Sequence, residues 1–318
     1  MNSGSAARPY GITLGDSSGV GPEILLKAFS AGQLPRPFRV FGDRAVLSYY
    51  NDKLALGVQL EIVDVRDPGL LKSSDVTPGQ LSRESGAAAR QYVVDATKAA
   101  LAGEISAVVT LPINKEATQM TDPKFTGHTE LIGELCGSDD VTIMLVSDQL
   151  IVTHVSTHVS LKAAIARAKK ERVLKIIQLT GAAVSRLRSN PRIAVAGLNP
   201  HAGENGLFGD EEIQEIRPAV EEAKKQGIPV EGPLAPDTLF YLAVQKKKYD
   251  AIVCMYHDQG HIPLKLLDFE GGVNVALGLP IIRTSVDHGT AFDIAGKGIA
   301  STTSLLRAIE LALRLASN

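Results

Sequence analysis

The amino-acid sequence predicts an α/β protein with a largely parallel β-sheet that is covered by helices on both faces. Short apolar runs rich in Val and Ile alternate along the chain with longer amphipathic stretches. The short runs are continuously apolar, which is typical of strands that are buried on both faces. A length of 318 residues with 44% hydrophobic residues is enough for two lobes rather than one.

The short apolar runs are predicted to be strands. In chain order they are Gly11–Leu14, Phe38–Phe41, Leu60–Val65, Ile105–Leu111, Val141–Val146, Ile151–Val155, Ile193–Leu198 and Tyr249–Met255. The hydrophilic stretch Ser147–Gln149 separates two of these runs and predicts a hairpin turn, so the sheet is expected to be mixed. The amphipathic stretches are predicted to be helices. They are Glu23–Ser30, Ser82–Ala102, Leu161–Leu187, Glu211–Gln226, Asp237–Lys247 and Thr302–Leu315.

The composition argues against several classes of protein. A net charge of −2 without a clustered basic surface argues against binding to nucleic acid. No apolar run approaches the roughly 18 residues that a membrane-spanning helix needs, and no secretory signal is visible. Two cysteines, Cys136 and Cys254, do not make a disulfide framework. We therefore expect a cytoplasmic protein that binds neither nucleic acid nor membrane.

Three of the seven histidines closely follow predicted strands. His158 follows Ile151–Val155, and His201 and His257 follow the two later strands of the same predicted sheet. Ligands of open α/β sheets bind at the carboxyl ends of the strands, so these imidazoles are expected at one edge. Three imidazoles with open coordination positions describe a catalytic divalent-metal site. The carboxylates of Asp237 and Asp258 are candidates for orienting these ligands or a water molecule.

Two glycine-containing segments are candidates for binding anions or nucleotides. The segment Gly15–Glu23 follows a strand and opens a helix, with Pro22 suited to the first helical turn. It fits either a phosphate site or a tight strand-to-helix turn, and its glycines do not have Rossmann or P-loop spacing. The segment Val286–Gly298 is rich in small residues, so its backbone amides could approach a nucleotide while a carboxylate takes a ribose hydroxyl. Lys265, Asn274 and Arg283 form a further polar group in the C-terminal region, where Arg suits phosphate or carboxylate.

With these motifs, the chain resembles the 4-hydroxythreonine-4-phosphate dehydrogenase family of pyridoxal phosphate biosynthesis. The resemblance extends from about Gly11 to Ala300. It is carried by Gly15–Glu23, Pro112–Glu116, Gly127–Glu130, Thr157–His158, Gly197–Glu204, Pro236–Phe240, Tyr256–Gly260 and Val273–Gly298.

The resemblance implies a two-lobed fold similar to isocitrate and isopropylmalate dehydrogenases, with an active cleft between the lobes. One lobe is expected over about 1–130 and 285–318, with the termini and the nucleotide loop. The second, over about 131–284, would carry the metal ligands and the dimer contacts. The implied assembly is a homodimer with a shared active site, in which one subunit contributes His257 and the partner His158 and His201.

The resemblance also implies roles for individual residues. His158, His201 and His257 match the family's metal ligands, for Zn2+, Mg2+, Mn2+ or Co2+. The residues that match substrate ligands are His128, Thr129, Lys265, Asn274 and Arg283. The segment around His288, Gly289, Thr290, Ala291 and Asp293 is similar to the adenosine-binding loop of the isopropylmalate enzymes, which implies NAD or NADP as cofactor. The general base remains open among Lys115, Asp237 and Asp258.

Two segments depart from the family pattern. Ser17 and Ser18 stand where the family usually has Pro-Ala. After Gly260, where the biosynthetic enzymes usually continue with Leu-Pro, this chain has His261-Ile262-Pro263. That motif is similar to the catabolic branch that oxidises D-threonate 4-phosphate or D-erythronate 4-phosphate. It favours His261 as a further substrate-binding residue that distinguishes a hydroxyl from an ammonium at carbon 2.

The expected reaction is oxidation of D-threonate 4-phosphate or D-erythronate 4-phosphate with loss of CO2; D-threonate 4-phosphate would give dihydroxyacetone phosphate. One alternative within the family is 4-phosphohydroxy-L-threonine dehydrogenase of pyridoxal 5'-phosphate biosynthesis. An alternative of another class is a phosphate acyltransferase, which occurs on a related fold, and a third is a sensor without enzymatic activity. The strand-end histidines argue against the acyltransferase, which needs no metal. The full set of metal- and substrate-binding residues argues against the sensor.

Overall fold

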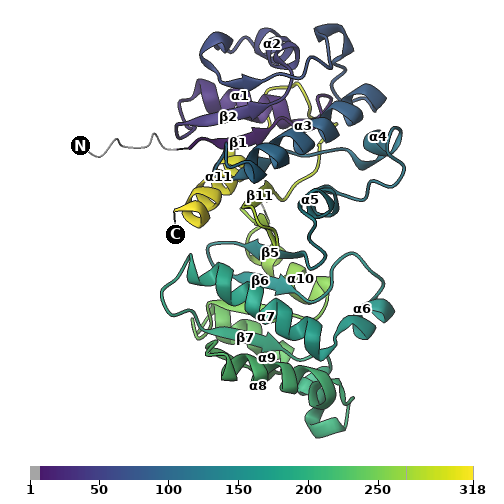
Figure 1. Cartoon of the computed structure of the whole chain (residues 1–318), viewed down its shortest axis with the longest axis vertical. Coiled ribbons are helices and arrows are strands. Elements are labelled where there is room, and N and C mark those ends of the chain that lie inside the picture. Colours follow the sequence, from purple (N-terminus) through teal and green to yellow (C-terminus); the bar gives the residue numbers. More distant parts are fainter. Residues whose placement is uncertain (1–7, 270, 318) are drawn as a thin grey trace, which may run out of the picture. The chain divides into compact units, whose positions relative to one another are not determined.

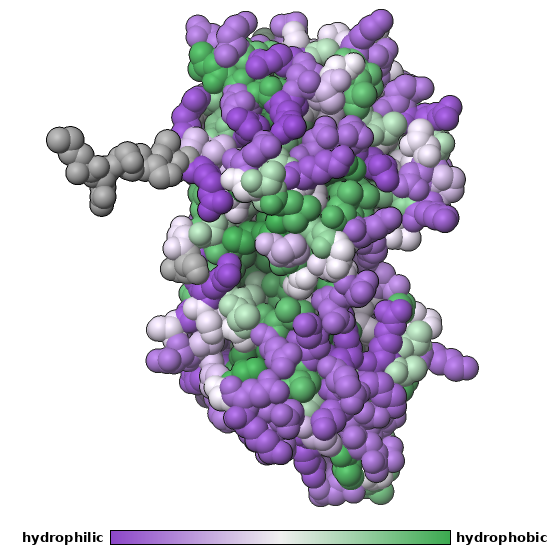
Figure 2. Space-filling model, in the orientation of Figure 1, coloured by the Kyte–Doolittle hydropathy of each residue, from purple (hydrophilic) through white to green (hydrophobic). Residues whose placement is uncertain are grey.

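The structure is a computed structural model that describes residues 8–269 and 271–317. These residues form two compact units (Figure 1). Unit 1 comprises residues 8–139 and 279–317, and unit 2 comprises residues 140–269 and 271–278. Residues 1–7 and 318, which belong to the predicted first lobe, lie outside the described residues, as does Glu270 of the second. Figure 2 shows mostly hydrophilic side chains on the visible face of each unit, with smaller groups of hydrophobic side chains among the hydrophilic ones.

Unit 1 contains five parallel strands in the order β3-β2-β1-β4-β11. They are β1 (Tyr10–Thr13), β2 (Phe38–Phe41), β3 (Val65–Arg66), β4 (Val108–Thr110) and β11 (Arg283–Val286). Its helices are α1 (Gly21–Ser30), α2 (Arg44–Lys53), α3 (Arg83–Leu101), α4 (Lys115–Gln119), α5 (His128–Cys136) and α11 (Thr303–Ala316), with 3-10 turns η1 (Leu60–Ile62) and η2 (Ser73–Asp75). Helix α3 packs on β1, β2 and β4, and α11 packs on β11 and β4. The strand order reverses between β1 and β4, where α/β sheets typically bind ligands.

Unit 2 contains strands in the order β10-β5-β6-β9-β7-β8. They are β5 (Thr142–Val146), β6 (Ile151–His154), β7 (Ile193–Ala196), β8 (Val230–Leu234), β9 (Ala251–Cys254) and β10 (Val273–Leu277). Strands β6, β9, β7 and β8 are parallel, whereas β5 is antiparallel to both β10 and β6. The predicted hairpin is confirmed, because the Ser147 amide donates to the Leu150 carbonyl at 2.9 Å between antiparallel strands.

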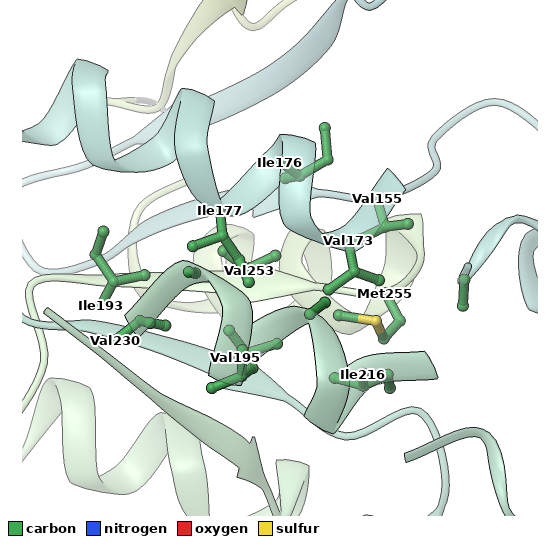
Figure 3. Close-up of a cluster of buried hydrophobic side chains, with 14 residues drawn as sticks. Val155, Val173, Ile176, Ile177, Ile193, Val195, Ile216, Val230, Val253 and Met255 are labelled. Atoms are coloured by element: carbon green, nitrogen blue, oxygen red, sulfur yellow. The ribbon is translucent and has the colours of Figure 1, made fainter. Parts of the chain in front are cut away.

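Helices cover both faces of the sheet in unit 2. They are α6 (Leu161–Arg167), α7 (Lys170–Ser185), α8 (Arg217–Lys225), α9 (Pro236–Val244) and α10 (His257–Leu267), with turns η3 (Pro200–Gly206) and η4 (Glu212–Ile216). Ile193 and Val195 of β7 pack into one apolar cluster with α7, η4 and α8 (Figure 3). Ala194 and Ala196 belong to a second cluster with α9 and α10. Since neighbouring strand residues point to opposite faces, both kinds of position must be apolar, as the continuous runs predicted.

Two predicted elements are wrong in part. The predicted strand Leu60–Val65 is mainly the turn η1, and only Val65 continues into the two-residue strand β3. Ile62 is 56% exposed, so this run does not bury an apolar face. The predicted helix Leu161–Leu187 is divided into α6 and α7, because Glu215 accepts hydrogen bonds from the Lys170 amide and the Lys169 ammonium and caps a new helix start. No helix among residues 8–269 and 271–317 is long and apolar enough to span a membrane.

Candidate active site

Three parallel strands of unit 2 carry the three predicted metal ligands at one edge. Strands β6 and β7 both pair with β9, so the order is β6-β9-β7 and their carboxyl ends lie side by side. His158 lies four residues beyond the end of β6, His257 three beyond β9 and His201 five beyond β7. The predicted common edge for these loops is therefore confirmed by the strand order.

His158 and His257 line one cavity of about 440 Å³. Their ring centroids are 5.8 Å apart with an angle of 45° between the planes. The lining comprises Thr157, His158, Val159, Ser160, Leu161, Ala164, Tyr256, His257 and Asp258. The spacing allows both imidazoles to approach a common ion from different strand ends. His158 and His257 thus lie together within one chain, whereas the resemblance implied that His158 comes from the partner of the subunit that contributes His257.

Asp258 orients the imidazole of His257. Its carboxylate oxygen Oδ1 lies 2.7 Å from His257 Nδ1. When that nitrogen carries the proton and donates it, Nε2 is the nitrogen left with a lone pair for a metal. Metal-ligating histidines typically donate their other N–H to a carboxylate in this way. Asp258 is exposed and lines the cavity. Asp237, in the first turn of α9, is not one of the described residues that line this cavity.

His201 lies in a left-handed turn that is held by a buried carboxylate. Residues 201–205 all have positive φ angles, a conformation that costs about 1–2 kcal/mol per residue for non-glycine residues. Glu212 is 1% exposed and accepts hydrogen bonds from the Leu198 and Asn199 amides at 2.7 Å each. A Cβ on Gly197 would lie 2.8 Å from the Ala202 Cα, so the turn needs glycine there. In the described part of this one chain, no three His, Cys, Asp or Glu side chains form a group that could hold a metal.

A buried glutamine connects the loops that follow β9 and β7. The Gln259 Oε1 atom accepts a hydrogen bond from the Met255 amide at 2.7 Å, and its Nε2 donates to the Gly197 carbonyl at 2.8 Å. Ser156, after β6, donates to the Met255 carbonyl at 3.1 Å. These bonds fix the three loops relative to one another, and no local sequence pattern singles out Ser156 or Gln259.

Replacing Gln259 by leucine is expected to lower the free energy of unfolding by about 2–6 kcal/mol. The change leaves one buried amide and one buried carbonyl without partners, and each such group costs about 1–3 kcal/mol. Urea denaturation followed by circular dichroism measures the difference. The matched control Gln226→Leu alters an exposed glutamine and should change stability by less than about 0.5 kcal/mol. Equal stability of the two variants would contradict the bridging role.

Buried imidazoles lie behind His257. His154, at the end of β6, is fully buried, and burial lowers the pKa of His154 to about 3. His261 of α10 is 8% exposed and stacks on His257 with centroids 3.6 Å apart. The described residues that line the cavity do not include His261. The sequence analysis had assigned no role to His154.

Unit 1 contains a second set of predicted site residues, which includes two cationic side chains. Arg283 on β11 is 2% exposed and donates from Nε and Nη2 to Thr110 Oγ1 at 3.2 and 2.7 Å. Burial lowers the pKa of Arg283 to about 10, so it remains charged at neutral pH. His128 and Thr129 begin α5, and the buried His128 Nε2 has no hydrogen-bond partner among the described residues. Lys115 begins α4 and is exposed.

His128 gives unit 1 a specific dependence on pH. Burial, followed by the charges of Arg283 and Lys115, holds the pKa of His128 well below its ordinary value near 6.5. Below that value the unfolded chain takes up a proton that the folded chain does not. The free energy of unfolding should therefore fall with decreasing pH, by up to ~1.4 kcal/mol per pH unit from this group. Urea titrations at several pH values from about 7.5 to about 5 should show that the free energy of unfolding depends less steeply on pH in His128→Gln than in wild type.

The exposed His288 is the matched control for this experiment, since His288→Gln should leave the slope unchanged. If His128→Gln and the wild type lose stability in parallel, His128 is not the group responsible.

The predicted nucleotide loop is attached to the glycine-containing turn after β1. The Val20 amide donates to the Thr290 carbonyl at 3.0 Å, and a Cβ on Gly19 would lie 2.9 Å from the same oxygen. Gly289 has open space around it, and Ala291 has a φ of 44°. His288 and Asp293 are exposed. The two motifs therefore lie together in unit 1, which sequence spacing could not show.

The remaining predicted substrate residues lie in unit 2. Lys265 on α10 places its Nζ 5.3 Å from the centroid of the Phe269 ring. Asn274 on β10 has a buried Oδ1 without a hydrogen-bond partner among the described residues. A buried polar atom that lacks a protein partner is a natural contact for a bound polar group.

The histidine loops of unit 2 thus lie beyond the carboxyl ends of β6, β9 and β7, where open α/β sheets bind small molecules, and unit 1 contributes the buried guanidinium of Arg283. The fold and these side chains define an α/β enzyme of small-molecule metabolism. The chain belongs to the family described as pyridoxal phosphate biosynthetic protein PdxA, whose family model matches residues 33–312.

Proteins with a similar sequence carry dehydrogenase names. The chain is 46% identical to a putative D-threonate 4-phosphate dehydrogenase of Oceanobacillus iheyensis, over 96% of this chain and 97% of that protein. It is 44% identical to a 4-hydroxythreonine-4-phosphate dehydrogenase of Trichlorobacter lovleyi, again over 96% and 97%. The crystal structure of a putative 4-hydroxythreonine-4-phosphate dehydrogenase from Salmonella typhimurium is similar, with a TM-score of 0.87 and 42% identity over 97% of this chain and 99% of that one.

Proposed function

We propose that this protein is an NAD-dependent, divalent-metal-dependent dehydrogenase that oxidises the 3-hydroxyl of a phosphorylated four-carbon hydroxy acid. The chain is an oxidoreductase of a family whose relatives are named for phosphorylated hydroxy acids. The observation that carries the proposal is the pair of imidazoles, His158 and His257, in one cavity beside the carboxylate of Asp258.

His158, His201 and His257 would hold the metal. Neutral imidazoles at three neighbouring strand ends fit Zn2+, Mn2+ or Co2+, and Mg2+ with added oxygen ligands. When bound, such an ion supplies Lewis-acid polarisation of the substrate oxygen at carbon 3, which assists both oxidation and the later loss of CO2. Asp258 would accept a hydrogen bond from His257 Nδ1 and so leave the other ring nitrogen, Nε2, available to bind the metal.

The substrate's anionic groups would be bound by Arg283 and Lys265, with His128, Thr129 and Asn274 as hydrogen-bonding partners. Thr110 occupies two of the five N–H donors of Arg283, and this leaves the others for an anion. Lys115, Asp237 and Asp258 are the candidates for the base that removes the hydroxyl proton. NAD, or NADP, would lie against the loop of His288, Gly289, Thr290, Ala291 and Asp293 and accept the hydride from carbon 3. The 3-oxo acid then loses CO2 by cleavage of the bond between carbons 1 and 2.

The preferred substrates are D-threonate 4-phosphate and D-erythronate 4-phosphate. The His261-Ile262-Pro263 motif supports this preference over 4-phosphohydroxy-L-threonine, which has an ammonium at carbon 2. Relatives with both kinds of name have similar identity, so substrate kinetics must decide.

The experiment is a screen of the purified protein with NAD or NADP and each of the three acids, in which NADH or NADPH formation is followed. We expect the highest kcat/KM with a hydroxylated acid, loss of turnover with a chelator and recovery with a divalent ion. Full activity of a rigorously metal-free preparation would contradict the metal mechanism. A higher kcat/KM for the aminated acid would make the substrate preference wrong while leaving the dehydrogenase intact.

A homodimer with a shared active site is the second part of the proposal. Ile262 and Leu266 lie four residues apart on α10 and are 63% and 85% exposed, with Phe269 beyond the helix end at 73%. Exposed apolar residues of this size are typical of surfaces that another chain covers. Within the described part of one chain, no three metal-ligating side chains form a group that could hold a metal. This also supports completion of the site by a second copy.

Mixing two inactive variants tests the shared site. In a heterodimer of His201→Ala with His257→Ala, one of the two shared sites keeps both histidines. We expect recovery of up to about half of wild-type activity per dimer. A purified heterodimer without activity would place all ligands in one chain.

A further inference from the structure

Three imidazoles form a continuous column in unit 2. The His257 and His261 rings are almost parallel, with an angle of 11° and centroids 3.6 Å apart. The His154 and His261 centroids are 4.6 Å apart, and His261 Nδ1 lies 3.1 Å from His154 Nε2. Only His257 of these three lines the cavity among the described residues.

Two backbone carbonyls determine which ring nitrogens carry protons. His261 Nδ1 lies 3.1 Å from the carbonyl oxygen of His257, and His154 Nδ1 lies 3.3 Å from that of Ile143. A carbonyl oxygen can only accept, so each Nδ1 must be the donor. Because His261 Nδ1 carries a proton, His154 Nε2 at 3.1 Å must be the acceptor between the two rings. Both histidines thereby carry a proton at Nδ1.

We propose that His154 is a positioning residue, which fixes the tautomer and plane of His261 so that His261 supports the ring of His257 from behind. His257 is then oriented from two sides, by Asp258 at its Nδ1 and by His261 on its face. This inference rests on the proposed metal site. It gives His261 a role through its contact with His257, and His261 need not touch the substrate for that role.

Gly260 allows the column to form. A Cβ at this position would lie 2.6 Å from His154 Nε2 and 2.9 Å from Cys254 Sγ. Helix α10 therefore approaches β6 closely only because residue 260 has no side chain. This offers a second way to disturb His154 without changing any imidazole.

The experiment compares full-length variants by two measurements that do not depend on turnover. Nitrogen-15 chemical shifts of the imidazoles in the metal-free protein report the tautomer of His261. Competition with a chromophoric chelator measures the dissociation constant for Co2+. His154→Phe keeps a ring but removes the acceptor, and it should change the His261 shifts and weaken Co2+ binding by about 10- to 100-fold. His154→Gln offers an amide oxygen near the Nε2 position and should recover part of the affinity, and Gly260→Ala should resemble His154→Phe.

The matched control is Thr153→Val on the same strand. It removes a buried hydrogen bond of 2.8 Å to Thr180 on the other face of β6, so it should lower stability without changing His261 or Co2+ affinity. Unchanged His261 shifts and unchanged affinity in both His154→Phe and Gly260→Ala would overturn the inference. If wild type itself binds no Co2+, the proposed metal site fails, while the shifts of His261 still decide whether His154 fixes its tautomer.

Discussion

Replacing His257 by alanine is expected to lower kcat/KM by at least about a thousandfold and to remove the bound metal. Charge stabilisation by a metal is worth several kcal/mol in the transition state, and ~4 kcal/mol corresponds to about three powers of ten. His257, the proposed metal ligand, has its Nδ1 atom 2.7 Å from Asp258 Oδ1, and its ring stacks on that of His261 with centroids 3.6 Å apart. Its loss removes one of the two imidazoles that line the cavity.

Metal content by mass spectrometry and kcat/KM at saturating NAD are the two measurements for this variant. His288→Ala removes an exposed histidine of unit 1 and should retain the full metal content. His257→Ala with wild-type metal content and activity would exclude His257 as a ligand. Loss of activity with full metal content would instead assign His257 to the substrate.

Replacing Arg283 by methionine is expected to lower kcat/KM for the phosphorylated acid by about a hundredfold or more. Hydrogen bonds to charged groups are each worth about 1.5–3 kcal/mol, and the guanidinium can make two to one anion. Arg283 is 2% exposed, and burial lowers its pKa to about 10, so the buried side chain still carries a positive charge at neutral pH. Arg283→Lys keeps a charge but loses the planar fork, and we expect it to recover only a small part of the activity.

A measurement of stability distinguishes loss of anion binding in Arg283→Met from loss of the folded structure. The free energy of unfolding of Arg283→Met, measured by urea denaturation, shows whether the variant is folded under the assay conditions. The exposed Arg66, which pairs with Glu104 at 2.9 Å, gives the control Arg66→Met with wild-type kcat/KM. Undiminished kcat/KM in a folded Arg283→Met protein would show that Arg283 does not bind the anion.

Much of the fold follows from local patterns in the sequence. The run Phe38–Phe41 has the bounds of β2, and the hairpin of β5 and β6 lies where the hydrophilic turn predicted it. Strands without a continuous apolar run were missed. Strand β8 contains Glu231, Gly232 and Pro233, and β11 begins with Arg283. Such strands are held by pairing with neighbours rather than by their own composition.

The candidate site was predictable to the extent that its residues follow strands. His158 and His257 were identified from strand ends, and their common cavity is a property of the parallel pair β6 and β9. Gln259, Glu212 and His154 were missed, because each acts through partners that are remote or on another loop. Gln259 donates to a carbonyl 62 residues away, and His154 contacts His261 across 107 residues.

Local patterns are enough to predict the α/β class, most of the strands and the histidines that follow them, because periodicity and turn residues act over a few neighbouring positions. The place of β9 between β6 and β7, and hence which histidines share a cavity, depends on how distant segments pair. The contact between His154 and His261 and the lowered pKa values of His128 and Arg283 likewise depend on the tertiary structure. These properties depend on burial and on the charges and carbonyl groups that distant segments place next to a side chain, so they cannot be predicted from neighbouring residues in the sequence.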